Sequence, residues 1–63
     1  MKFREIEKII LRDGWFYVQT TSSHYQYEHP TKPGKVTIPV HGMNEDIGHG
    51  LLRSIKRQAG IKE

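Results

Sequence analysis

Three short runs rich in aromatic and β-branched residues lie between residues 15 and 39, and only a few residues link each run to the next. The runs span 15–20, 24–29 and 35–39, and residues of these types favour strands. A parallel connection needs a dozen or more residues, so links this short predict antiparallel pairing of consecutive strands. The link at 31–34, Thr-Lys-Pro-Gly, has proline and glycine where a turn needs them. We therefore expect a three-stranded antiparallel meander.

The segments on either side of these runs show helical periodicity. The first is a predicted helix over residues 2–12, which Asp13 and Gly14 end, with the glycine suited to a left-handed cap. The second begins near residues 48–50 and ends before Gly60. Their apolar faces consist of Phe3, Ile6, Ile9 and Ile10 in the first helix and Leu51, Leu52, Ile55 and Ala59 in the second. The order is α-β-β-β-α, which predicts an α+β fold with both helices on one face of the sheet.

The length of the chain, 63 residues, predicts a single domain over residues 1–63. A domain of this size buries only about 60% of the surface of its unfolded chain, so any active site should be shallow. There are no cysteines, which excludes disulfides and thiolate metal sites and fits a cytoplasmic protein. No apolar run approaches the roughly 20 residues that span a bilayer, and the first residues do not form a signal peptide, so we expect no association with membranes.

Basic residues outnumber acidic ones by 10 to 7, which gives a net charge of +3 and a pI near 9.5. This balance predicts an anionic partner, and nucleic acid is the commonest one. The alternative is a small basic domain that binds no particular partner.

Five short motifs follow one another along the chain. They are Asp-Gly-Trp-Phe at 13–16, Ser-Ser-His-Tyr at 22–25, His-Pro at 29–30, Val-Thr-Ile-Pro-Val-His at 36–41 and Leu-Arg-Ser-Ile-Lys-Arg-Gln-Ala-Gly at 52–60. Their order and spacing resemble those of the HicA toxins of bacterial HicAB toxin–antitoxin systems, over about residues 3–61. Two positions depart from the family pattern: Ser22 stands where a glycine is expected, and Tyr25 stands where a second histidine is expected.

The resemblance implies a fold like that of double-stranded-RNA-binding domains and an endoribonuclease that cleaves messenger RNA. It also implies inhibition by a HicB antitoxin that covers the active site. The first histidine of the motif, His24, is marked by the resemblance as catalytic.

The chemistry of histidine supports this interpretation of His24. RNA carries its own nucleophile, the 2′-hydroxyl, and histidine can either remove its proton or protonate the leaving 5′-oxygen near neutral pH. One histidine fills one of these roles at a time, so we expect water or a second group, His41 first and His29 second, to fill the other. If Tyr25 and Tyr27 face the helices, His24 lies on the open side of the sheet. The plainer reading of His24 is a strand-end histidine that only hydrogen-bonds a neighbour.

Five basic side chains are candidates for binding the RNA phosphates. They are Lys32 in the turn, Lys35 at the third strand, and Arg53, Lys56 and Arg57 on the second helix. A solvated basic face is the alternative, and Lys56 and Arg57 suit an acidic antitoxin surface equally well. We expect no cofactor and no metal site, because His24 and His29 fall on opposite faces of a strand and no His-x-x-x-His pair exists.

Two other functions remain open at this point. One is a non-catalytic RNA-binding module, since double-stranded-RNA-binding domains share the α-β-β-β-α order. The absence of lysines at 48–51, the start of the second helix, favours the enzyme instead. The other is a structural protein whose aromatic sheet face docks a second chain. The aromatic residues 15–17 could stack on bases, but we expect them to supply the core.

Overall fold

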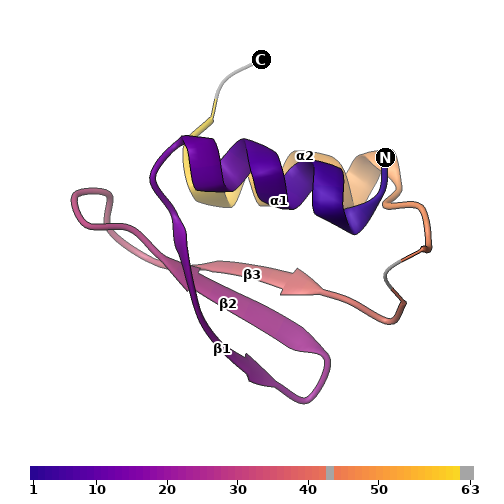
Figure 1. The fold of residues 1–63 in the computed structure, drawn as a ribbon. Coiled ribbons are helices and arrows are strands. Elements are labelled where there is room, and N and C mark those ends of the chain that lie inside the picture. Colours follow the sequence, from indigo (N-terminus) through magenta and orange to yellow (C-terminus); the bar gives the residue numbers. More distant parts are fainter. Residues whose placement is uncertain (43, 62–63) are drawn as a thin grey trace.

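The computed structural model describes residues 1–42 and 44–61. The elements follow in the order α1 (Phe3–Arg12), β1 (Phe16–Thr21), β2 (His24–Glu28), β3 (Val36–Pro39) and α2 (His49–Ala59). The strands form one antiparallel sheet in the order β1-β2-β3, and both helices lie on the same side of it (Figure 1). The predicted α+β meander is confirmed, with element ends that differ from the expected ones by a residue or so.

The core fills the space between the helices and the sheet. It contains Phe3, Ile6, Ile10, Trp15, Tyr27, Val36, Ile38, Ile55 and Ala59. Tyr27 is fully buried, and its hydroxyl donates a hydrogen bond of 2.6 Å to Oε2 of Glu7 on α1. Burial, with the nearby Glu7 carboxylate, raises the pKa of this hydroxyl. Tyr25 meets the Phe3 ring edge-on with centroids 5.1 Å apart, so both tyrosines of β2 face the helices as the alternation predicted.

The prediction that residues 15–17 supply the core is right for Trp15 and wrong for the other two. Trp15 is buried, and its indole N–H donates to the carbonyl oxygen of Ala59 at the end of α2. Phe16 and Tyr17 are 48% and 49% exposed, and Val18 is 43% exposed. The reason is that the helices pack on the side of β2 and β3, whose Tyr27, Val36 and Ile38 are in the core, and leave all six residues of β1 exposed. An irregularity in the pairing falls at Val18.

His29 ties the end of α1 to the turn after β2. Its side chain is buried, and its Nε2–H donates to the carbonyl oxygen of Asp13 at 2.8 Å. Its Nδ1 accepts the backbone N–H groups of Thr31 and Lys32, each at 3.0 Å. Gly14 lies against the ring with a φ of +110°, so the positive φ expected at this glycine is confirmed.

Candidate active site

His24 is the first residue of the central strand, and its side chain is exposed. It pairs with Thr21 of β1 on one side and with Pro39 of β3 on the other. Since Tyr25 and Tyr27 face the helices, the alternation of β2 puts His24 on the opposite, open face. A ligand can therefore reach the imidazole without any movement of the core.

A two-residue turn holds His24 in place. Ser22 and Ser23 join β1 to β2, and Ser22 has a φ of +56°. Positive φ at the first of two turn residues is the pattern of a type II′ hairpin, in which glycine is favoured at that position. A left-handed conformation costs an L-residue roughly 1–2 kcal/mol. The departure from the expected glycine is thus a local strain that leaves the hairpin formed.

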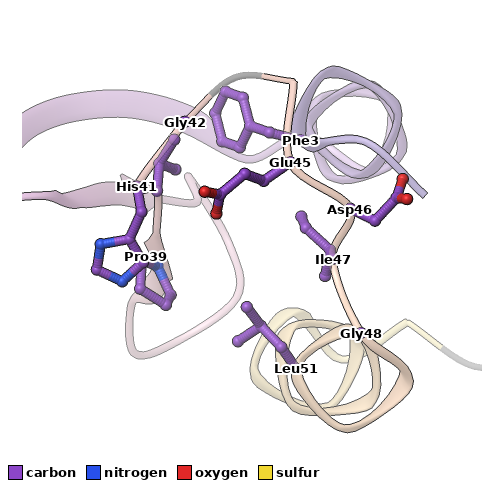
Figure 2. Close-up of a pocket in the computed structure, with 10 residues that line it drawn as sticks. Phe3, Pro39, His41, Gly42, Glu45, Asp46, Ile47, Gly48 and Leu51 are labelled. Carbon is purple, nitrogen blue, oxygen red and sulfur yellow. The ribbon is translucent and has the colours of Figure 1, made fainter.

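His41 lies at the same end of the sheet as His24. Pro39, two residues before it, pairs with His24, and the Val40 N–H donates to the carbonyl oxygen of Ser23 at 2.8 Å. The His41 side chain is exposed. Figure 2 shows its imidazole pointing away from a small hollow into which Glu45 extends. Of the two histidines suggested as a second acid or base, the structure brings His41 toward His24.

His29, the other suggestion, lies at the far end of β2. Both of its ring nitrogens take part in the hydrogen bonds to Asp13, Thr31 and Lys32 described above. Its ring also packs edge-on against Trp15, with centroids 5.1 Å apart. This environment gives His29 a structural role.

Lys32 belongs to the same far end of the sheet. Its ammonium donates to the Asp13 carboxylate and to the carbonyl oxygen of Ala59, the last residue of α2. The hydrogen bond from Lys32 lowers the pKa of the Asp13 carboxyl below its ordinary value, although partial burial opposes this. Lys32 thus joins the ends of both helices, away from His24, instead of lying beside the histidine.

The other candidate cations do not gather around His24 either. Arg53 and Lys56 line a hollow on α2 with His49, and Arg57 is exposed on the same helix. The helices lie on one side of the sheet (Figure 1), and the alternation of β2 puts His24 on the other, so these three cations are separated from the imidazole. Lys35 is exposed just before β3.

The hollow in Figure 2 is not suited to phosphate. It lies between α1, the end of β3 and the start of α2 and is lined by Phe3, Pro39, Val40, His41, Gly42, Glu45, Asp46, Ile47, Gly48 and Leu51. Its two carboxylates, Glu45 and Asp46, would repel an anion. Asp46 also pairs with the Lys2 ammonium at 3.2 Å, which fixes the start of the chain to this loop. The surface around His24 is therefore the better candidate.

A row of polar side chains lies next to His24 on the open face of the sheet. Gln26 pairs with Gln19 of β1 and with Thr37 of β3, so the three residues cross the open face together. The Gln26 amide donates to Oγ1 of Thr21 at 3.1 Å. The signal for Gln26 was present, because it shares the parity of His24 on β2. Its partners on β1 and β3 were not predictable, because the sequence does not give the register of the strands.

Within residues 1–42 and 44–61, no group of three or more His, Asp or Glu side chains is placed to hold a metal ion. In the same part of the chain, no helix has the length and apolar character needed to cross a membrane.

Comparison with known proteins agrees with the motifs. A family model described as the HicA toxin of bacterial toxin–antitoxin systems matches residues 3–61, nearly the whole chain. A search of curated proteins gives no match. The fold and the position of His24 in its hairpin are those that the motifs led us to expect. The chain belongs to the HicA family of toxins of bacterial toxin–antitoxin systems.

Proposed function

We propose that this toxin is an endoribonuclease that cleaves messenger RNA through His24 without a metal ion, and that a HicB-type antitoxin neutralises it. The observation that carries the proposal is an exposed histidine on the open face of the central strand in a chain of the HicA family. The open face is accessible to a single strand, in which the 2′-hydroxyl is free to move into line with the scissile bond.

The reaction that this geometry supports is an internal transesterification. The 2′-oxygen attacks the adjacent phosphorus, and the bond from phosphorus to the 5′-oxygen breaks. One proton leaves the 2′-hydroxyl and one reaches the 5′-oxygen, so a base and an acid are both required. We assign one of these roles to His24 and the other to His41, because the pairing of Pro39 with His24 brings both to one end of the sheet.

Binding of the RNA backbone is assigned to cations outside the immediate site. Lys35, Arg53, Lys56 and Arg57 raise the positive potential of a protein whose net charge is +3. Such a potential increases the rate of encounter with an anionic strand, and this effect does not require contact with the scissile phosphate. Lys32 is the weakest candidate of the five, because Asp13 already pairs with its ammonium.

The test is incubation of the purified protein with a single-stranded RNA in the presence of EDTA. We expect cleavage in EDTA, and we expect an equimolar HicB-type antitoxin to abolish it. Cleavage that appears only after a divalent metal is added would contradict the metal-free mechanism. Binding of RNA with a steep salt dependence but without cleavage would instead support the non-catalytic RNA-binding module.

The edge strand β1 supports the assignment of a protein partner. Phe16, Tyr17 and Val18 are each nearly half exposed, and exposed apolar side chains on an unpaired edge are typical of sites where another chain adds a strand. The same strand contains Thr21, the partner of His24 in the sheet. An antitoxin that docks along β1 therefore lies next to the histidine that it must cover.

A lysine at Val18 should weaken inhibition by the antitoxin by about tenfold or more, because it places a charge in an apolar contact. Inhibition of RNA cleavage, titrated with antitoxin, measures this. Leu11→Lys is the matched control, since Leu11 is 44% exposed against 43% for Val18 but lies on α1. An unchanged inhibition constant for Val18→Lys would show that the antitoxin does not dock on β1.

A further inference from the structure

The open face of the sheet carries two cross-strand rows of side chains near the site. The first consists of Thr21, His24 and Pro39, and the second of Gln19, Gln26 and Thr37. Along β2 the rows are two residues apart, which is about 7 Å. A nucleotide whose phosphate meets the first row therefore has its own base, or the next one, within reach of the second.

The second row is suited to a base instead of a phosphate. Its side chains are two amides and a hydroxyl, and none carries a charge. A row without cations adds no charge to phosphate binding, whereas neutral donors and acceptors at fixed positions can read base edges. Gln26 is at the centre of the row and is partly buried, so its side chain has fewer conformations to lose on binding than an exposed one.

The hydrogen bond to Thr21 determines which groups of Gln26 remain for a ligand. A glutamine amide has two N–H donors and one carbonyl acceptor. One N–H of Gln26 is used by Oγ1 of Thr21 at 3.1 Å. The carbonyl oxygen and the other N–H then remain for a ligand, and the hydrogen bond sets which end of the amide faces Thr21.

We propose that Gln26, oriented by Thr21, is a base-reading subsite of the toxin that selects adenine beside the cleaved bond. The N–H and carbonyl oxygen of a planar amide can pair with N7 and the N6 amino group of adenine, and no other base shows an acceptor beside a donor on that edge. This inference rests on the proposed ribonuclease function, because it assigns the nucleotide that the same site prefers. Gln26 acts as a specificity residue and takes no part in proton transfer.

The experiment sequences the cut ends that the wild-type protein produces from a single-stranded RNA library of random sequence. We expect adenine to be enriched about tenfold at one position beside the cut. Gln26→Glu keeps the size of the side chain but removes its donor, so this enrichment should disappear. Thr21→Val keeps the shape of the Thr21 side chain but removes the hydroxyl that orients the Gln26 amide. The amide can then rotate by 180°, so the adenine enrichment should fall in part.

Gln58→Glu is the matched control. This glutamine lies on α2, and its carbonyl oxygen accepts the Thr37 backbone N–H at 2.9 Å, a role that a glutamate retains. Its cleavage pattern should be that of the wild type. Cleavage without adenine enrichment, or with the same enrichment in Gln26→Glu, overturns the subsite and leaves the ribonuclease standing. An absence of cleavage by the wild type overturns both.

Discussion

His24→Ala should lower RNA cleavage by at least about 100-fold and abolish growth arrest while the protein remains folded. General acid–base catalysis by a positioned side chain contributes typically 10²–10⁴-fold, and alanine removes the whole group. The fold should tolerate the change, because the side chain is exposed on the open face of the sheet. The measurements are the rate of RNA cleavage in EDTA and the thermal unfolding temperature.

The matched control for this variant is His49→Ala. His49 is also exposed, but it begins α2, on the helix side of the sheet. The His49→Ala variant should cleave RNA at the wild-type rate. His41→Ala should lose activity as well if it supplies the second proton transfer. Growth arrest by His24→Ala at equal expression would remove His24 from the mechanism, whatever the result for His41.

The fold was predictable because local and global signals agree along this chain. Helical periodicity surrounds three runs with strand propensity, and the two-residue link at Ser22 and Ser23 leaves no alternative to a hairpin. The side of the sheet on which His24 lies was predictable for a related reason. Tyr25 and Tyr27 are large and share one parity, so they face the helices and leave His24 to the open side.

Contacts between distant residues were not predictable from these patterns. The predicted meander puts the first strand at an edge of the sheet but does not say which strands the helices cover, so the exposure of Phe16 and Tyr17 was not predictable. Lys32 was assigned to RNA from its charge alone. Its ion pair with Asp13, 19 residues away, exists because the turn after β2 folds back against the ends of both helices. The charge of Lys32 alone therefore did not predict the residues that it contacts.

Gly14→Ala should destabilise the protein by about 4–6 kcal/mol, measured by urea unfolding. A non-glycine residue at a φ of +110° is strained by about 1–3 kcal/mol. The added Cβ would also lie 2.6 Å from Nε2 of His29. Moving that ring breaks its hydrogen bonds to Asp13, Thr31 and Lys32, each worth about 1 kcal/mol. A domain of 63 residues has roughly 3–9 kcal/mol of stability, so much of the variant should be unfolded.

Two further variants separate the strain from the clash. Gly50→Ala is the control for glycine itself: a Cβ there meets no atom within 4 Å, so the helix α2 should be unchanged or stabilised by up to about 1 kcal/mol. In a His29→Ala background the clash at Gly14 is gone and only the backbone strain remains. Gly14→Ala should then cost less than it does in the wild type, since residues in contact are not additive. Equal costs in both backgrounds would mean that the imidazole does not restrict position 14.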